Sequence, residues 1–183
     1  MLISTPPAPA ETALSGGEAQ AREALGRSQG GFSTELHLRV EGNGRPITAV
    51  LTGGERHEQI ALEALLDQGA IRRPGRGRPR LRPRCAAGDK GYSSPTARRR
   101  LRRRHIRAVI PSKSNQRRQP NFDRAAYRRR NLVERLINRL KQFRRIATRY
   151  EKRAANYLGM VHIGMLLLLL CQIPSRNSAL PMA

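Results

Sequence analysis

The chain has 183 residues, enough for one domain with a hydrophobic core but short for two. It carries 36 Lys and Arg against 13 Asp and Glu, a formal net charge of +23, and only four of these bases are lysines. Phosphate neutralisation by such arginines is the main sequence-independent source of affinity for DNA. Coding bias in a GC-rich genome is the alternative explanation, but it would not leave acidic residues so rare. We therefore expect a protein that binds nucleic acid.

The cysteines and the apolar segments argue against secreted, zinc-binding and membrane proteins. Cys85 and Cys171 have no CxxC partner and no nearby histidine pair, and they suit a reducing cytoplasm. Residues 1–17 lack the charged and apolar regions of a secretory signal. The run 161–171 includes five consecutive leucines but is shorter than the ~18–20 residues of a membrane span. We expect a buried helix there and no membrane partner.

The first part of the chain predicts a tail followed by an antiparallel hairpin. Residues 1–26 are rich in Pro, Ala, Gly and Ser and are expected to be a disordered or loosely ordered tail. Residues 32–40 alternate with the period of a half-buried strand, and 46–52 form a second apolar strand after a Gly-Asn-Gly reversal. The apolar members of the first strand are Leu36, Leu38 and Val40, and the polar ones are Glu35, His37 and Arg39.

The middle of the chain alternates helices with short strands. Residues 57–67 have helical spacing, whereas 71–84 form a flexible basic Pro/Gly/Arg loop that is either disordered or an arm lying on DNA. Residues 85–87 and the segment 108–111 are short buried strands. Between them, a helix over 94–105 is favoured by a serine N-cap and by Pro95 in its first turn.

The remainder predicts helices. Asp123 can cap a long helix that runs to about residue 150, and 151–171 gives a second, increasingly apolar helix before a tail over 173–183. The order of hairpin, helix, strand, helix, strand and long helix indicates an α/β domain with a mixed sheet.

Four residues of the long helix share one face. Tyr127, Arg130, Glu134 and Lys141 stand at i, i+3, i+7 and i+14, within a sector of roughly 60° at ~100° per residue. The apolar stripe lies elsewhere on the helix and comprises Leu132, Leu136, Leu140, Phe143 and Ala147. A single acid among bases is a plausible metal ligand beside a phosphate backbone, so this face suggests a catalytic helix that handles nucleic acid.

Asp89 is the second notable acid because it directly follows an apolar strand, where α/β folds commonly bind ligands. The alternative is a turn-forming aspartate that caps its own loop, and position alone does not decide between the two. Together with Glu134, Asp89 could hold a Mg²⁺ ion, which prefers hard oxygen ligands. Nuclease sites use such ions to activate water and to stabilise the leaving oxygen.

Residues 98–104 place six arginines in seven positions. A solvated face is the simple explanation, but these charges repel one another unless an anion is near, so we expect phosphate contacts. The residues concerned are Arg98, Arg99, Arg102 and Arg103. The four histidines match no metal motif, and structural or surface roles are expected for them. Tyr92 either stacks near Asp89 or packs at the strand exit.

Three segments resemble a known family. GDKGY at 88–92, AVIP at 108–111 and YRRRNLVERLINRLKQFRRIATRYEK at 127–152 look like the C-terminal half of bacterial DDE transposases of the insertion-sequence 5 type. Residues 26–58 are similar to the central hairpin region of the same group. The resemblance covers roughly residues 26–170, and its Y-x2-R-x3-E-x6-K signature is complete.

The resemblance implies an RNase H-like catalytic domain over 27–172, with a mixed sheet flanked by helices. Asp89 and Glu134 would be catalytic carboxylates that bind Mg²⁺ or Mn²⁺, while Tyr127, Arg130 and Lys141 would position DNA. The implied reaction is metal-dependent DNA cleavage and strand transfer in DNA transposition, a form of DNA recombination that moves the transposable element. The implied partners are the terminal inverted repeats, target DNA, and a second copy or the full-length transposase. The implied location is the bacterial cytoplasm, on the nucleoid when DNA is bound.

One departure from the family pattern concerns the first catalytic aspartate, which lies upstream of the GRSQGG segment in this family. Residues 1–25 contain no Asp. We therefore expect a truncated copy, or the second frame of a split element, that lacks the first strand and binds DNA but cleaves it poorly. The alternatives are a non-enzymatic basic DNA-binding remnant or modulator of the full-length enzyme, and an RNA-binding protein. RNA binding would explain the charge but not the four-residue face.

Overall fold

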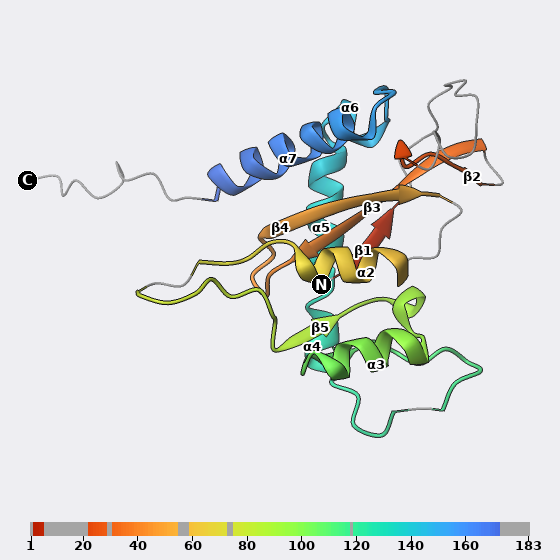
Figure 1. The fold of residues 1–183 in the computed structure, drawn as a ribbon, viewed down its shortest axis with the longest axis vertical. Coiled ribbons are helices and arrows are strands. Elements are labelled where there is room, and N and C mark those ends of the chain that lie inside the picture. The colour runs from red at the N-terminus through yellow and green to blue at the C-terminus, as the bar shows by residue number, and fades with distance from the viewer. Residues whose placement is uncertain are drawn as a thin grey trace, which may run out of the picture.

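The computed structural model describes residues 2–5, 22–28, 31–54, 59–72, 75–117 and 119–172. They form an α/β structure in which strands predominate in the first part of the chain, helices alternate with short strands in the middle, and helices follow at the end (Figure 1). The strands are β1 (Leu2–Thr5), β2 (Gly26–Ser28), β3 (Gly31–Val40), β4 (Pro46–Gly53), β5 (Cys85–Ala87) and β6 (Arg107–Val109). The helices are α2 (Gln59–Asp67), the 3-10 helix η1 (Lys90–Tyr92), α3 (Pro95–Arg103), α4 (Arg124–Arg128), α5 (Asn131–Lys141), α6 (Arg144–Ala147) and α7 (Ala154–Leu170).

The predicted hairpin is confirmed. β3 and β4 pair antiparallel, with Leu36 opposite Leu51. The turn between them closes through a hydrogen bond from Gly44 N to Glu41 O of 3.1 Å, and Gly44 has a φ of +87°, which glycine adopts readily. The strand β5 and the helix α3, with Ser94 as its N-cap, also lie where the sequence predicts them.

The expectation of a tail over 1–26 is wrong for its described parts. β1 pairs antiparallel with β3, with Leu2 opposite Arg39, and β2 pairs with the beginning of β3. Ala24 and Leu25 are buried, and Thr34 Oγ1 donates a hydrogen bond of 2.8 Å to Ala24 O. A strand therefore does precede the hairpin, although its sequence, Leu-Ile-Ser-Thr, contains no carboxylate. Strand pairing with β3 outweighs the tail-like composition of the flanking residues, of which 6–21 lie outside the described part.

The expected single mixed sheet is also wrong in detail. β1, β2, β3 and β4 form an antiparallel sheet, whereas β5 and β6 form a separate parallel pair, with Ala86 opposite Ala108. In the described residues no ladder joins the two sheets. The parallel pair is connected through α3, as a parallel pair requires a crossover connection.

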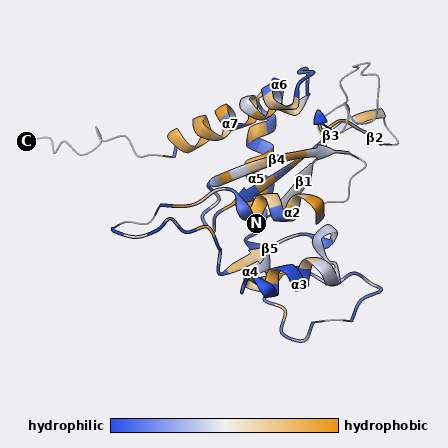
Figure 2. Ribbon diagram, in the orientation of Figure 1, coloured by the Kyte–Doolittle hydropathy of each residue, from blue (hydrophilic) through white to orange (hydrophobic). Residues whose placement is uncertain are grey.

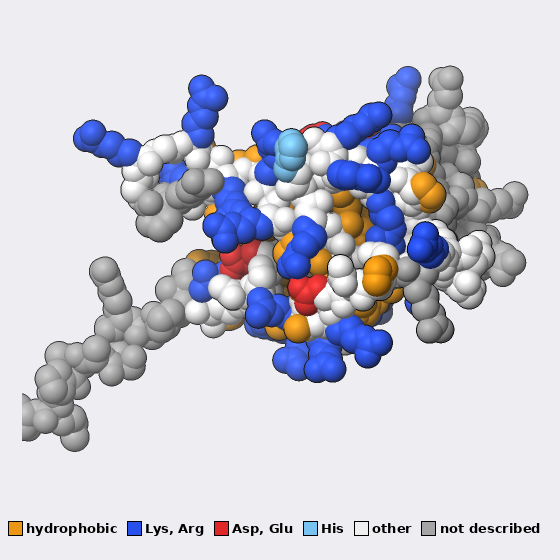
Figure 3. Space-filling view, turned by 90° about the horizontal axis from the view of Figure 1, so that it is seen from below, with side chains coloured by type: hydrophobic (Ala, Val, Ile, Leu, Met, Phe, Trp, Pro, Cys, Tyr) orange, Lys and Arg blue, Asp and Glu red, His pale blue; other side chains and the backbone are white. Residues whose placement is uncertain are grey.

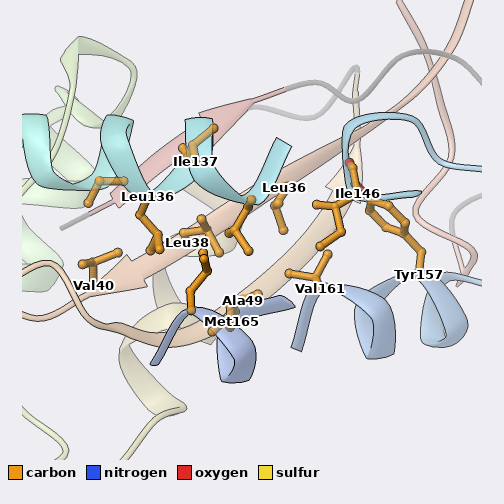
Figure 4. Packing of buried hydrophobic residues seen from close by; sticks show 13 residues of the cluster. Leu36, Leu38, Val40, Ala49, Leu136, Ile137, Ile146, Tyr157, Val161 and Met165 are labelled. Carbon is orange, nitrogen blue, oxygen red and sulfur yellow. The ribbon is translucent and has the colours of Figure 1, made fainter. Parts of the chain in front are cut away.

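The main core lies on one face of the antiparallel sheet. Leu36, Leu38 and Val40 of β3 point between α5 and α7 (Figure 4). Along most of its length α7 is apolar, as the hydropathy colours of Figure 2 show. A second core joins α2, η1, α3 and the β5–β6 pair, with members that include Leu62, Leu65, Tyr92, Leu101 and Ile110.

Because of this second core, β3 is buried on both faces, which corrects the expectation of a half-buried strand. His37 is fully buried and Arg39 is only 4% exposed. His37 Nδ1 lies 3.2 Å from Tyr92 Oη, so Tyr92 packs at the strand exit, which was one of its two expected positions. The alternating pattern of β3 predicts that its polar face meets solvent. The prediction is wrong because the segments that cover this face lie far away in the sequence, where the local pattern does not indicate them.

The long helix expected from Asp123 to about residue 150 is broken into α4, α5 and α6. At the first break the backbone stays helical but bonds from i to i+3, as in Arg130 N to Tyr127 O at 2.9 Å. At the second break Phe143 has extended dihedral angles, with φ −77° and ψ 107°.

The last helix, α7, has 17 residues. Among the described residues, no helix combines the length and apolarity that crossing a membrane requires.

Candidate nucleic-acid interface

Asp89 follows β5 and Gly88 directly, at the carboxyl end of a parallel strand. Its Oδ1 accepts a hydrogen bond of 2.9 Å from Gly91 N, so the residue caps η1. The turn-forming role that the sequence left open is therefore present in the structure. A cap uses one carboxylate oxygen, so this contact does not prevent the other oxygen from binding a ligand.

One of the four signature residues, Arg130, contacts two of the others. Arg130 Nη2 lies 2.6 Å from Glu134 Oε1, and the Arg130 guanidinium carbon lies 5.4 Å from the centre of the Tyr127 ring. The Tyr127 ring itself packs against Phe122, with 5.3 Å between the ring centres. The side chain of Glu134 is 46% exposed and that of Arg130 is 22% exposed. The junction of α4 and α5 thus presents an aromatic ring, a cation and a carboxylate in contact.

Lys141 lies apart from this group. It is exposed at the end of α5, seven residues beyond Glu134, which corresponds to about 10 Å along a helix axis. The four residues are spread along two successive helices, α4 and α5 with the residues that join them, and Lys141 does not join the group at Arg130. Lys141 can contact a polymer that follows the helix, such as a DNA backbone, rather than a small ligand at Glu134.

The described residues do not assemble a metal site. Asp89 caps η1, Glu134 pairs with Arg130, and no group of three His, Cys, Asp or Glu side chains converges in the described ranges. Hard divalent cations need several oxygen ligands, and Mg²⁺ demands near-octahedral geometry. Two carboxylates from separate segments supply fewer oxygen ligands than that donor set requires.

The arginine run of α3 divides into two groups. Arg100 Nε lies 3.2 Å from Glu63 of α2, and Arg104 forms a two-pronged pair with Asp67 at the end of α2. The hydrogen bond from Arg104 lowers the pKa of the Asp67 carboxyl and raises the pKa of Arg104. Two carboxylates of α2, a helix distant in the sequence, thus neutralise part of the positive charge of this arginine run.

Arg98 also has a structural role. Its Nη2 donates to Ile110 O at 2.8 Å and to Ser93 Oγ at 3.0 Å, and burial lowers the pKa of its guanidinium. Arg99, Arg102 and Arg103 are exposed and form no ion pair with any described residue. These three are therefore the members of the run that remain available to phosphate.

Two hollows adjoin this surface, and arginines contribute to the lining of both, although the lining of the second is mostly apolar and includes Glu41. One, of about 520 Å³, lies beside α3 and β6 and is lined by Arg98, Arg102 and Arg107, with His105 at its edge. The other, of about 380 Å³, lies between the hairpin turn, β5 and α4. Its arginines are Arg39, Arg80, Arg82, Arg84 and Arg129. Figure 3 shows basic side chains spread over the face seen from below, with few acidic ones between them.

The second hollow was not predicted. The sequence marks 71–84 as basic, but Arg129 joins these arginines only because α4 lies beside β5 in the fold. The ion pair between Arg107 Nη2 and Asp123 Oδ2, at 3.1 Å, helps to hold that arrangement. No local sequence signal links residues more than forty positions apart.

Comparisons with known proteins identify the family of the chain. The family described as Transposase DDE domain matches residues 7–170 of the chain. A protein of Burkholderia cepacia, named as a transposase for the insertion sequence element IS402, is 34% identical over 132 residues. The match covers 72% of this chain and 60% of that relative, so the chain spans less than two thirds of the relative's length. No solved structure matches the chain.

The family match covers most of the chain and includes Asp89, Glu134 and the helical segment that carries the signature residues. The chain belongs to the family of transposases with a DDE domain.

Proposed function

We propose that this chain is the catalytic-domain part of an insertion-sequence transposase of the insertion-sequence 5 type and that it binds DNA. The observation that carries the proposal is the family match over residues 7–170, joined to the contact of Tyr127, Arg130 and Glu134 at the start of α5. An antiparallel sheet followed by parallel strands that alternate with helices supports the RNase H-like assignment.

We assign the proposed roles to side chains that solvent, and therefore a ligand, can reach. Asp89 and Glu134 are the two carboxylates that act at the scissile phosphate. Tyr127, Arg130 and Lys141 position the DNA along the helical segment. Arg99, Arg102 and Arg103 contact phosphates on the face of α3, since their guanidinium groups are exposed and unpaired among the described residues.

We further propose that the chain alone is catalytically incomplete. Enzymes of this kind use divalent cations as Lewis acids, but the described carboxylates do not complete a site for Mg²⁺ or Mn²⁺. The strand β1, which pairs beside β3, contributes no carboxylate. DNA binding is therefore expected without cleavage of the element ends or transfer to target DNA.

DNA binding is tested by fluorescence anisotropy of the full chain with a labelled duplex at several salt concentrations. The slope of log K against log salt is negative, and changing Arg99, Arg102 and Arg103 together to Gln should make it shallower. Its magnitude should fall by about 0.9 for each phosphate that the variant no longer neutralises, or about 2–3 in total. The matched control is Arg144→Gln on α6, an exposed arginine outside this surface, which should change the slope by less than about 0.9. An unchanged slope in the triple variant would remove α3 from the interface.

Cleavage is tested with supercoiled plasmid carrying element ends, in Mg²⁺ and separately in Mn²⁺. No nicking above the background of an Asp89→Asn variant is expected. Metal-dependent nicking that Asp89→Asn abolishes would show that the chain assembles a complete site, contrary to our proposal.

A non-enzymatic remnant that modulates the full-length transposase is the second candidate, favoured by the absence of a carboxylate in β1. Light scattering measures whether the chain forms a homodimer. Addition of the chain to an excision reaction of a full-length relative should reduce the yield if it modulates that enzyme, and an unchanged yield would argue against this role.

A further inference from the structure

Between α2 and β5 the chain projects from the body of the molecule as a basic arm, which we define as residues 75–84 (Figure 1). Its sequence, GRGRPRLRPR, contains five arginines and no acid. Residues 75–79 at its tip are all exposed. The arm is therefore a thin, strongly positive projection beside the hollow of about 380 Å³ at α4.

The base of the arm is fixed to the fold. Ile71 and Arg80 exchange two backbone hydrogen bonds, of 2.9 and 2.7 Å. Arg39, buried in β3, donates a hydrogen bond of 2.6 Å from Nη2 to Leu81 O. The direction in which the arm leaves the molecule is thus set by the sheet, while the tip is free to contact a ligand.

The tip has a narrow profile. Gly75 and Gly77 have φ angles of +96° and +140°, and a Cβ at either position would meet no atom within 4 Å. The glycines are therefore required by the backbone conformation and not by crowding within the protein. Arg76 and Arg78 flank Gly77, so two guanidinium groups extend from a backbone that has no side chain between them.

We propose that the tip, Arg76-Gly77-Arg78, inserts into the minor groove of A·T-rich DNA. This inference rests on the proposed function, because DNA is the ligand. The minor groove is only ≈ 6 Å wide, and A-tracts narrow it further and strengthen the negative potential that attracts arginine. A backbone with glycine between two arginines can approach the floor of such a groove, where a branched side chain would collide with the walls.

Simple phosphate contact is the alternative use of these charges. It would need neither Gly77 nor its unusual backbone, and it would not distinguish base pairs. Within our proposal, phosphate contact is left to the arm's base, where Arg82 and Arg84 line the hollow of about 380 Å³ together with Arg129. The backbone beside the occupied minor groove would lie along this hollow.

The test compares three duplexes that differ only in a central block of A·T, G·C or inosine·C pairs, with binding of the full chain measured by anisotropy. Inosine lacks the N2 amino group that guanine places in the minor groove, but it keeps the major-groove face of guanine. We expect the A·T and inosine·C duplexes to bind about tenfold more tightly than the G·C duplex.

Variants assign this preference to the arm. Gly77→Val and Arg78→Lys both keep the net charge. Both positions are exposed, and valine at Gly77 meets no neighbouring atom but is disfavoured by the φ of +140°. Each variant should reduce the preference to below about twofold. Arg144→Lys on α6 is the control and should keep it. Far-ultraviolet circular dichroism shows whether each variant keeps the fold.

The outcomes separate the two proposals. Equal affinity for the three duplexes, inosine·C binding as weakly as G·C, or a preference that survives both arm variants would overturn minor-groove insertion while leaving DNA binding intact. Absence of binding to any duplex would overturn the proposed function as well.

Discussion

Replacing Arg39 with methionine removes a buried guanidinium from the centre of a hydrogen-bond network. Its Nη1 donates to Leu65 O at 3.0 Å, to Leu66 O at 3.3 Å and to Gln68 O at 2.7 Å, and its Nη2 donates to Leu81 O. The first three acceptors are at the C-terminal end of α2, where helix carbonyls have no partner within the helix. A cation here also interacts favourably with the helix dipole.

The magnitude follows from burial. Hydrogen bonds to a charged group contribute about 1.5–3 kcal/mol each, and a carbonyl left unsatisfied in the interior costs about 1–3 kcal/mol. These terms are not additive, because burying the guanidinium has its own desolvation cost, which also lowers the pKa of Arg39. Removing this donor leaves four neutral carbonyl oxygens without their charged partner, and after the relief of the guanidinium's desolvation cost the net loss is about 3–5 kcal/mol. We expect Arg39→Met to lower the free energy of unfolding by that amount.

Urea denaturation followed by circular dichroism measures the effect. Arg144→Met is the matched control, since this arginine is exposed and should change the free energy of unfolding by less than about 0.5 kcal/mol. Arg39→Lys should recover only part of the loss, because an ammonium group cannot reach acceptors in α2 and in the arm together. A loss below about 1 kcal/mol in Arg39→Met would refute the reasoning, as it would equal a single neutral hydrogen bond.

One histidine of the core and two glycines of α7 give further predictions. Burial lowers the pKa of His37 to about 4 from 6.5, so as the pH falls between these values the unfolded chain gains a proton that the folded chain does not. The free energy of unfolding should therefore fall by up to about 1.4 kcal/mol for each unit of pH in this range. The carboxylate of Glu35, 3.6 Å from His37 Nε2, reduces this loss because it favours the protonated imidazole. In urea denaturation at several pH values, His37→Gln should lack this part of the pH dependence. In α7, Gly159→Ala should stabilise by about 0.5–1 kcal/mol because nothing lies within 4 Å of its Cβ. Gly164→Ala should destabilise by about 1 kcal/mol or more because its Cβ would lie 2.6 Å from Ile146 Cδ1, and equal melting temperatures for the two variants would contradict this.

Much of the secondary structure could be predicted because its signals are local. The Gly-Asn-Gly turn with period-2 flanks produces the β3–β4 hairpin, and Ser94 with Pro95 begins α3, since these residues act on their immediate neighbours. The break at Phe143 carries no such signal, because neither Gly nor Pro stands there. β1 was missed because a four-residue strand is stabilised by pairing with β3 and not by its own pattern.

The candidate site, too, was predictable from the sequence only where its residues are close together in the chain. The spacing of Tyr127, Arg130 and Glu134 predicts that they share one side of a helical segment, and in the structure Arg130 contacts both Tyr127 and Glu134. The sequence left two roles open for Asp89, and the structure shows the hydrogen bond of a cap. Whether Asp89 and Glu134 act on one phosphate stays a prediction.

The sequence alone determined the charge, the order of most elements and the residues that the DDE family shares, because each of these is carried by composition or by short spacings. Only the tertiary structure decided which arginines are held within the protein and which remain exposed to a ligand. Backbone carbonyls hold Arg39 and Arg98, and Asp67 holds Arg104. On α3, by contrast, Arg99 and Arg103 remain exposed. A guanidinium is bound or free according to the acceptors that distant segments bring to it, and no local pattern of residues contains that information.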